Sequence, residues 1–402
     1  MSESLGALAA WIALAWAGLL VWLTIGASLR RAVLERDAKA AREQASGVAR
    51  GVSVLIIRPC AGVDEGLLDN LCSILAVDSQ ATLSLLMCAD DPTDPAVAVI
   101  QQALPRLRAA GLDAQLEIHP PTGPNRKASL LAAALAGAQA RAAELVVNVD
   151  SNVDLRDYDL DSLLAPLLTG ARVGASWAPW VEVRSAAGLG PRASEAVLGG
   201  SLAAFPLLCG LDPGGLVGKL WAARREALEG IGGFAPLVDY LGEDFEMARR
   251  LGAAGWSVEV APVLGRSRGG AGGFAKVVER LARWLLVLRG QRPLLLLTYP
   301  LFFFATPGIL ALAALGARAR PLEALVAASM AVAARALITL AARYWSGRMG
   351  AGHYGGALLD APLSDLSLAL AWLRALASRE VSWRGHRLRV ARGGRLEALD
   401  AD

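Results

Sequence analysis

The chain begins with a long uncharged stretch, and its later segments mix hydrophobic and polar positions. Leu5 to Leu29 is mainly apolar and meets its first charge only at Arg30. A helix needs about 20 such residues to cross the hydrocarbon core of a bilayer. The pattern therefore predicts a transmembrane anchor over residues 5–29. A signal peptide fits less well, because the run is long and no small-residue cleavage site follows it. A buried core helix is the alternative.

Short runs typical of strands, the first of them β-branched, then alternate with segments of helical spacing. The expected strands are Gly51–Pro59, Leu83–Ala89, Gln115–Ile118 and Leu145–Val149. The expected helices are Asp64–Leu75, Pro95–Arg108 and Arg126–Leu145. This alternation predicts an α/β fold with a doubly wound, Rossmann-like nucleotide-binding sheet, in a catalytic domain over residues 51–290. Ligands of such sheets bind outside the carboxyl ends of the strands.

The last third of the chain is apolar again. Pro293 to Gly316 and Pro321 to Ala342 are long apolar runs, the second interrupted by Arg335, and Ala361 to Ala377 is a weaker candidate. They predict a C-terminal membrane region of two to three helices over residues 293–377. An arginine inside such a run either packs against another helix or marks a polar pocket. Residues 378–402 contain a basic, aromatic segment and are expected to form a basic cytoplasmic tail on an anionic lipid surface.

Composition supports a hybrid of membrane and soluble parts. Of the 402 residues, 54% are hydrophobic and 19% are charged, and the mean hydropathy is +0.42. The net charge of +3 gives no basic field of the kind that nucleic-acid binding requires, so nucleic acid is excluded as a partner. Positive residues follow the first apolar run closely, which places the next domain in the cytoplasm. They are Arg30, Arg31, Arg36, Lys39 and Arg42.

Carboxylates follow two of the predicted strands. Asp90-Asp91 comes after the second strand, and Asp150-Ser151-Asn152 comes after the fourth. One carboxylate at such an edge can reach a nucleoside, and another can hold a divalent cation against a diphosphate. Asn125-Arg126-Lys127 opens a helix where a phosphate could bind. Taken singly, each segment could instead be a turn, a helix cap or a solvated helix start.

The stretch from Tyr240 to Trp284 adds a second kind of chemistry. Glu243-Asp244 stands ahead of a helical segment, and Arg280-x-x-Arg283-Trp284 follows on another. A carboxylate can accept a proton from an alcohol, while the cations can bind a departing phosphate. Because Glu243 and Asp244 are adjacent, one of their two pKa values should be raised. A simple N-cap role is the alternative for Asp244.

Taken in order, these motifs resemble those of family 2 and family 21 glycosyltransferases, with the closest likeness to the ceramide glucosyltransferases. The residues concerned are Asp91, Asp150-Ser151, Gly242-Glu243-Asp244 and Arg280-x-x-Arg283-Trp284. Arg58-Pro59, Asn125-x-Lys127 and Ile231-Gly232-Gly233-Phe234 also fit the family. The likeness covers Val52 to Arg289, with membrane segments at both ends. It is specific for a transferase of the GT-A type and much less so for ceramide.

The resemblance implies a UDP-sugar donor, a divalent cation (Mg or Mn) and an inverting displacement that gives a β-glycoside. Asp91 and Lys127 would bind the donor, and Asp150 would bind the diphosphate through the metal. Asp244 would be the base. Arg280, Arg283 and Trp284 would bind the leaving diphosphate and close the acceptor site. Asp150-Ser151-Asn152 is not a full Asp-x-Asp motif, so a single carboxylate must serve the metal, with Asn152 offering at most a neutral oxygen.

The expected function is the transfer of a hexose, with glucose first, to a membrane lipid alcohol such as ceramide in glycosphingolipid biosynthesis. The expected location is the bacterial inner membrane, with the catalytic domain facing the cytoplasm. One alternative is an N-acetylglucosaminyl or other transferase acting on a hopanoid or another lipid. A second alternative, of another class, is a membrane scaffold that binds nucleotide without chemistry. Spacing alone does not decide which sugar is transferred.

Overall fold

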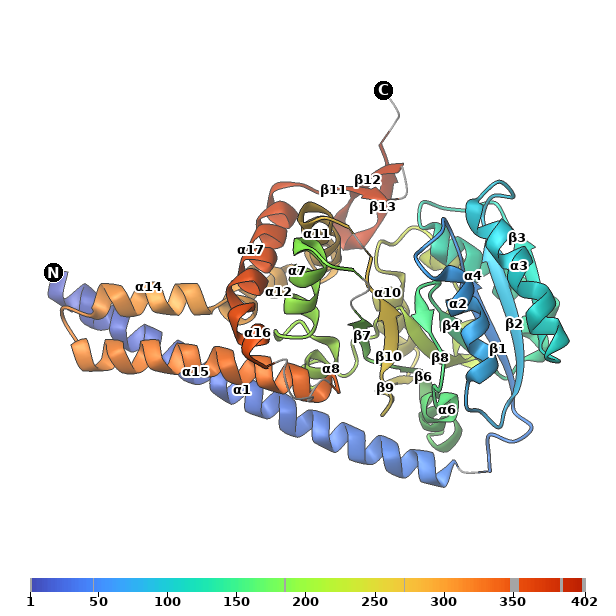
Figure 1. The fold of residues 1–402 in the computed structure, drawn as a ribbon, viewed down its shortest axis with the longest axis horizontal. Helices are drawn as coiled ribbons and strands as arrows, with labels where there is room; N and C mark the ends of the chain where they lie inside the picture. The colour runs from blue at the N-terminus through green and yellow to red at the C-terminus, as the bar shows by residue number, and fades with distance from the viewer. Residues whose placement is uncertain are drawn as a thin grey trace. The chain divides into compact units, whose positions relative to one another are not determined.

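The computed structural model describes residues 2–45, 47–183, 186–270, 272–347, 354–383 and 386–399. The chain divides into two compact units (Figure 1). The helical unit consists of Met1–Ala32, Arg184–Leu211 and Ala271–Ser378. The sheet unit consists of Val33–Val183, Asp212–Gly270 and Arg379–Asp402.

The sheet unit is built around a seven-stranded sheet in the order β3-β2-β1-β4-β8-β6-β9. The strands are β1 (Ser53–Pro59), β2 (Thr82–Ala89), β3 (Asp113–Ile118), β4 (Leu145–Val149), β6 (Val173–Trp177), β8 (Leu220–Arg224) and β9 (Ser257–Val260). β1 to β4 run parallel, whereas β8 lies antiparallel to both β4 and β6. The apolar strands are buried, as parallel strands covered on both faces require. The predicted α/β fold is thereby confirmed.

Helices connect these strands and supply the core. They are α2 (Leu67–Cys72), η1 (Ser73–Ala76), α3 (Pro95–Ala109), α4 (Arg126–Ala136), α5 (Ala138–Ala142), α6 (Leu160–Thr169), α9 (Arg225–Gly230), η2 (Ala235–Leu237) and α10 (Glu243–Ala253). Side chains of α2, α3 and α6 join those of β1, β2 and β4 in one apolar cluster. The long helix expected over residues 126–145 is divided into α4 and α5 at Gly137. The core fixes the strand ends, where the polar side chains lie.

Two small sheets complete this unit. The first has the order β5-β10-β7, formed by Val153–Asp154, Gly265–Arg268 and Trp180–Val183. The second is antiparallel, with the order β11-β12-β13, formed by Glu380–Trp383, His386–Val390 and Leu396–Ala398. It occupies the part of the chain where a basic tail was expected. The η3 turn (Arg392–Gly394) precedes β13. Arg384 and Gly385 of the basic segment lie outside the described residues.

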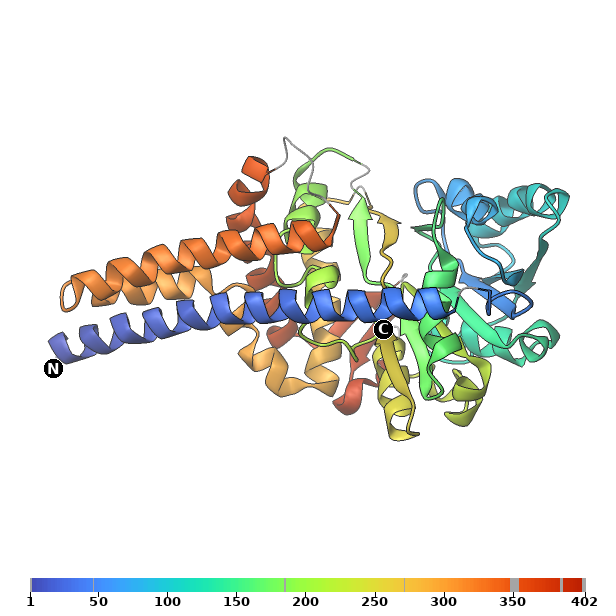
Figure 2. The same ribbon diagram turned by 90° about the horizontal axis from the view of Figure 1, so that it is seen from below.

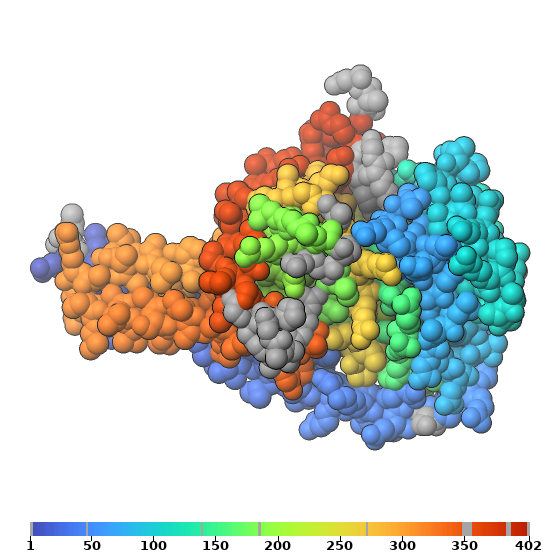
Figure 3. Space-filling view, in the orientation of Figure 1, coloured from blue at the N-terminus to red at the C-terminus, as the bar shows by residue number. Residues whose placement is uncertain are grey.

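The helical unit contains a bundle of α14 (Thr306–Gly316), α15 (Pro321–Trp345) and the part of α1 (Ser2–Gln44) up to Ala32. These helices run side by side in both ribbon views (Figures 1 and 2). Small side chains dominate their contacts, with Ala13, Ala17, Ala313, Ala327 and Ala331 all buried. Small residues let apolar helices approach closely, as in membrane bundles. In the space-filling view, α14 and α15 form one continuous surface, coloured orange (Figure 3).

Three described helices are long and apolar enough to cross a membrane: Glu3–Gln44, Pro321–Trp345 and Gly356–Ala377. The first contains the predicted anchor. The apolar run from Pro293 to Gly316 differs from the expectation, since it is divided into α12 (Pro293–Thr298), α13 (Pro300–Phe303) and α14. Proline cannot continue a helix ladder, and Pro300 and Pro307 stand where the new helices begin. Hydropathy alone did not register these breaks.

The other helices of this unit are α7 (Leu189–Leu198), α8 (Phe205–Leu208), α11 (Phe274–Gln291), α16 (Tyr354–Leu359) and α17 (Ala361–Ala377). α11 packs against α7 and α17. The two units therefore differ from the catalytic domain expected over residues 51–290, because α7, α8 and α11 group with the apolar helices. Their own apolar faces, such as Val277, Leu281 and Leu285 on α11, are buried there. Amphipathic helices bury their apolar stripe against the nearest apolar surface.

Candidate active site

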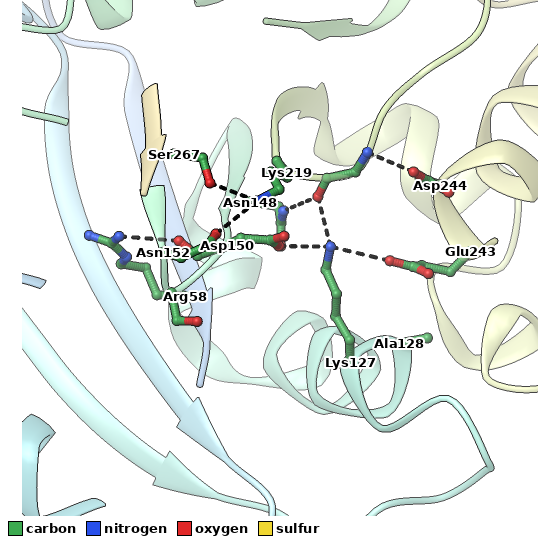
Figure 4. Close-up of polar contacts among 12 residues, drawn as sticks. Arg58, Lys127, Ala128, Asn148, Asp150, Asn152, Lys219, Glu243, Asp244 and Ser267 are labelled. Atoms are coloured by element: carbon green, nitrogen blue, oxygen red, sulfur yellow. Dashed lines mark hydrogen bonds and ion pairs between the residues drawn. The ribbon is translucent and has the colours of Figure 1, made fainter. Parts of the chain in front are cut away.

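Lys127 joins the carboxylates of the sheet unit (Figure 4). Its ammonium lies 2.8 Å from Oδ1 of Asp150 and 3.2 Å from Oε1 of Glu243. It also donates a hydrogen bond of 2.7 Å to the carbonyl of Gly218. Burial lowers the pKa of Lys127, but the two carboxylates outweigh it and hold the pKa above its ordinary value. Lys127 is therefore a fixed cation between the end of β4 and the start of α10.

Asp244 is the second residue of α10 and is held from outside its own helix. Its Oδ2 accepts the backbone N–H of Gly218 at 2.6 Å, and its Oδ1 accepts that of Phe245 at 2.8 Å. The N-cap of α10 is Gly242, so Asp244 does not have the N-cap role that was the alternative. The carboxylate is instead tied to the loop before β8.

Burial and the adjacent charge of Glu243 raise the pKa of Asp244 to about 7. Lys127 and the N–H groups of Phe245 and Gly218 act in the opposite direction but do not cancel the rise. The sequence led us to expect such a rise for one of this pair of carboxyls. A carboxyl with a pKa near the operating pH is well matched to accept and release protons.

Gly218 connects the two halves of this network. Its N–H donates to Asp244, while its carbonyl accepts from Lys127 and from Nδ2 of Asn148 at 2.9 Å. A Cβ atom at this position would lie 2.8 Å from Oδ2 of Asp244. Only glycine lets the carboxylate approach the backbone this closely. Sequence reasoning did not single out Gly218 or Asn148, and Gly-Lys just before a strand was the only available signal.

Asn125 supports the same network from the N-cap of α4. Its Oδ1 accepts the N–H of Ala128 at 3.0 Å, a standard cap contact. Its Nδ2 donates to the carbonyl of Tyr240 at 2.8 Å and to Oε2 of Glu243 at 3.0 Å. The residue that begins the Lys127 helix thus also holds the segment leading to Asp244.

The Asp150 loop is braced by a buried arginine. Arg58 donates to the carbonyl of Val153 at 2.6 Å and to that of Asp150 at 3.2 Å. Burial lowers the pKa of Arg58 to about 10. The guanidinium therefore fixes the main chain around the carboxylate that the resemblance assigned to the metal.

Asn152 points its side-chain oxygen at a cation. Oδ1 accepts from Nζ of Lys219 at 3.2 Å, and the same ammonium donates to Oγ of Ser267 at 2.7 Å. It also lies 4.3 Å from the centre of the Trp180 ring. The neutral oxygen that could have assisted a metal is thus engaged by Lys219.

A divalent cation fits this site only with ligands from the donor. Within the described ranges, no group of three or more Asp, Glu, His or Cys residues is arranged to hold a metal. Mg²⁺ in nucleotide enzymes is often held by one or two carboxylates, with substrate phosphates completing its shell. The Asp150 carboxylate, now paired with Lys127, offers one such ligand.

Asp91 occupies a different environment from the Lys127 network. It is exposed, and its Oδ1 accepts both the N–H and the hydroxyl of Thr93 at 2.7 Å. These bonds lower its pKa. Over the described part of the chain, no hydrogen bond or ion pair joins it to Lys127, Asp150 or Asp244. The neighbouring Asp90, which sequence reasoning did not select, is buried and paired with Arg126.

The remaining predicted site residues belong to the helical unit. Arg280 lies on α11, donates to Oγ of Ser194 on α7, and has its guanidinium carbon 5.5 Å from the Trp284 ring centre. The Trp284 ring meets Phe205 of α8 edge to face at 5.8 Å. Arg283 lies on the same helix. Arg280 and Trp284 thus form part of a packed group on α7, α8 and α11.

Comparison with known proteins gives one match over nearly the whole chain. The sequence model described as "Glycosyl transferase family 21" matches residues 11–396. This is more than half of the chain, and the match includes every residue of the candidate site.

Two solved structures show a distant likeness. A mannosyltransferase from Pyrobaculum calidifontis, in complex with GDP-Man and Mn²⁺, is 17% identical with a TM-score of 0.47, over 90% of this chain and 99% of that one. Glucosyl-3-phosphoglycerate synthase from Mycobacterium tuberculosis, with Mn²⁺, UDP and glucosyl-3-phosphoglycerate, is 19% identical with a TM-score of 0.35, over 62% and 82%. Likeness at this level says nothing of the donor or acceptor of this chain.

Proposed function

The chain belongs to glycosyl transferase family 21, and we propose that it moves a hexose, glucose first, from a UDP-sugar to the hydroxyl of a membrane lipid. Family membership makes it a glycosyltransferase and speaks against the non-catalytic scaffold. The first candidate acceptor is ceramide, which would give a β-glycosyl lipid by an inverting reaction. The observation that carries this proposal is the placement of Asp244 beside the Lys127 and Asp150 network.

Asp244 is proposed as the general base. An alcohol is a poor nucleophile near pH 7, and a placed carboxylate that accepts its proton contributes on the order of 10²–10⁴ in rate. A pKa of about 7 leaves a large part of Asp244 ionised at neutral pH and makes it a strong enough base for the task. Its two hydrogen bonds to backbone N–H groups fix the position of the carboxylate.

The donor half of the site is proposed to consist of Asp91, Lys127 and Asp150. Asp150 would be the protein ligand of Mg²⁺ or Mn²⁺, which supplies positive charge to the leaving diphosphate when bound. Lys127 would offer its ammonium to the phosphates from its place between Asp150 and Glu243. Arg280 and Arg283 would bind the leaving diphosphate, and Trp284 would close the acceptor site.

The apolar helices support a lipid acceptor. Three described helices are long and apolar enough to span a membrane, and a lipid alcohol would reach a membrane-bound enzyme laterally. The cations after the first apolar run favour a sheet unit in the cytoplasm, at the inner membrane of a bacterium.

A matrix of donors and acceptors tests the proposal. The purified full chain is given radiolabelled UDP-glucose, UDP-galactose or UDP-N-acetylglucosamine with ceramide, diacylglycerol or a hopanoid, and lipid-soluble label is counted. The proposal expects the strongest signal from UDP-glucose with ceramide. If label from UDP-N-acetylglucosamine appeared on a hopanoid, the proposed donor and acceptor would both be wrong. If no pair gave a labelled lipid, the proposal would be contradicted.

A further inference from the structure

The last described residues form a folded element with its own buried side. β11, β12 and β13 pair antiparallel, and Val381, Leu388, Val390 and Leu396 are all buried. The residues between them on β12, Arg387 and Arg389, are exposed. This alternation is that of a sheet with one face packed on protein.

The exposed face of this C-terminal sheet is mixed in charge. Arg387 lies 3.0 Å and Arg389 lies 3.7 Å from the carboxylate of Glu380. Arg389 is also directly opposite Glu397 on β13. Glutamates thus offset the two arginines, which weakens the expectation that this part of the chain binds anionic lipid. Another role has to account for the sheet.

The sheet is hydrogen-bonded to the segment that leads into the candidate base. The N–H of Leu396 donates to the carbonyl of Asp239 at 2.6 Å, and the N–H of Leu241 donates to the carbonyl of Gly394 at 3.1 Å. Tyr240 and Arg395 form the antiparallel bridge between these bonds. Asp239 to Leu241 therefore acts as a short further strand beside the η3 turn.

Tyr240 links the sheet to the catalytic helix. The Arg395 guanidinium lies 5.6 Å from its ring centre and donates to its hydroxyl at 3.4 Å. Arg250 of α10 lies 5.8 Å from the same ring. The carbonyl of Tyr240 accepts from Asn125, which also bonds Glu243. One residue thus contacts the C-terminal sheet, α10 and the N-cap of the Lys127 helix.

We propose that the C-terminal sheet is a positioning element for Asp244. It fixes Asp239 to Leu241, and only Gly242 and Glu243 separate that strand from the carboxyl that takes the proton. Without the sheet, the N-terminus of α10 would lose one of its supports, and Asn125, Lys127 and the N–H of Gly218 would remain. The inference rests on the proposed role of Asp244 as the base.

The turn before β13 offers a local way to disturb this support. Gly393 has φ of 76°, a left-handed conformation that side chains rarely adopt, and open space surrounds its Cβ position. Gly393→Val therefore strains the η3 turn without a clash. Gly111, in the turn between α3 and β3, has φ of 86° and the same open space, so Gly111→Val is a matched control.

The test compares the two variants in transfer assays and in UDP binding by calorimetry. The proposal expects Gly393→Val to lower kcat by about tenfold or more, since small misplacements of a catalytic group are costly. Its KM for the UDP-sugar and its affinity for UDP should stay close to wild type. Gly111→Val should keep all three values. Equal kcat in the two variants, or a parallel loss of UDP binding in Gly393→Val, would overturn the proposal.

If Gly393→Val cannot be obtained as folded protein, milder variants of Arg395 test the same proposal. Arg395→Gln should lower kcat with unchanged KM for the donor, and Arg395→Lys should restore part of it, because a cation remains over Tyr240. Arg392→Gln removes an exposed arginine of the same turn and should have no effect. Unchanged kcat in Arg395→Gln would count against the proposal. A wild-type enzyme without any transferase activity would refute the proposed function instead.

Discussion

Single atoms decide the geometry around Asp244. The carboxylate is held by two backbone N–H groups and is influenced by the charges of Glu243 and the Lys127 ammonium. Burial and the charge of Glu243 raise the pKa of Asp244 more than Lys127 and the two N–H groups lower it, so the proposed base titrates near neutrality. Replacing Glu243 should lower the pKa of Asp244 and replacing Lys127 should raise it, and the pH dependence of kcat should move accordingly.

Glu243→Gln should shift the acid limb of the kcat profile to lower pH. Glu243 is the like charge that raises the pKa of Asp244, and its removal leaves Lys127, which lowers that pKa. Since transfer requires the ionised form of Asp244, activity should persist further into acid. The measurement is kcat between about pH 5 and 9, a span centred on the raised pKa of Asp244, about 7. Glu259→Gln on β9 serves as the control, and an unmoved limb in Glu243→Gln would contradict this assignment.

The same raised pKa bears on stability with a defined sign. The folded protein holds the Asp244 proton more tightly than the unfolded chain, whose carboxyl has the ordinary value of 3.8. The contribution of this group to stability is therefore complete below pH 3.8 and is lost as the pH rises to about 7. A pKa shift that lowers stability at neutral pH is expected at a catalytic base, because active sites tune pKa values for function.

Gly218→Ala should impair catalysis more than folding. The added methyl group would lie 2.8 Å from Oδ2 of Asp244 and would displace the carboxylate from its N–H donor. We expect kcat to fall by about 10²-fold, as for other displacements of roughly 1 Å. Gly214→Ala, in the same loop and with open space around its Cβ position, should behave as wild type. Similar kcat values for the two variants would show that the close approach is unimportant.

At the scale of elements, the apolar helices enclose a buried ion pair. Arg335 of α15 donates to Oδ1 of Asp365 on α17 at 3.2 Å, to Thr339 at 2.8 Å and to the carbonyl of Gly200 at 2.7 Å. The sequence left open whether Arg335 packs against another helix or marks a polar pocket. The structure shows both features, since Arg335 packs against α17 and the pair borders a small cavity that Phe302 and Phe303 also line.

Asp365→Asn should destabilise the helical unit strongly, since it leaves a buried guanidinium without its counterion. Breaking one partner of a buried pair costs about 3–5 kcal/mol. The half-exposed pair of Arg192 and Asp360 in the same unit is the control, and Asp360→Asn should cost at most about 1 kcal/mol. Thermal unfolding in detergent measures both. The double variant Arg335→Met/Asp365→Leu should recover much of the loss, and equal unfolding temperatures of the single variants would refute this prediction.

Elements with one dominant local signal could be predicted from the sequence. β1 to β4 were located within a few residues, because short apolar runs that alternate with helical segments have few alternatives. The run from Pro293 to Gly316 was less predictable, since hydropathy outweighed the prolines that divide it. The C-terminal sheet escaped prediction for another reason. Its short strands are stabilised by pairing with each other and with Asp239 to Leu241. Contacts between residues so distant in sequence produce no hydrophobic periodicity that could be recognised.

At the scale of the molecule, sequence reasoning identified residue types better than it identified their partners. Lys127, Asp150 and Asp244 were selected, and the structure connects Lys127 to Asp150 directly and to Asp244 through Gly218. Arg126 was expected near a phosphate, yet it pairs with the buried Asp90. Gly218 was not foreseen, since its role depends on a backbone N–H that faces a residue distant in sequence. Motif spacing predicts which side chains are present at a site, but it does not predict which backbone atoms are hydrogen-bonded to them.

The most direct test of the account is lipid glycosylation by Asp244→Asn. Asparagine keeps the size of the side chain and can still accept the N–H of Gly218, so the fold and UDP binding should be retained. The measurement is single-turnover transfer of radiolabel from UDP-glucose to ceramide, together with UDP affinity by calorimetry. We predict that the rate falls by about 10²–10⁴ while UDP affinity stays near that of the wild type. Transfer at the full wild-type rate in this variant would contradict the assignment of Asp244 as the base.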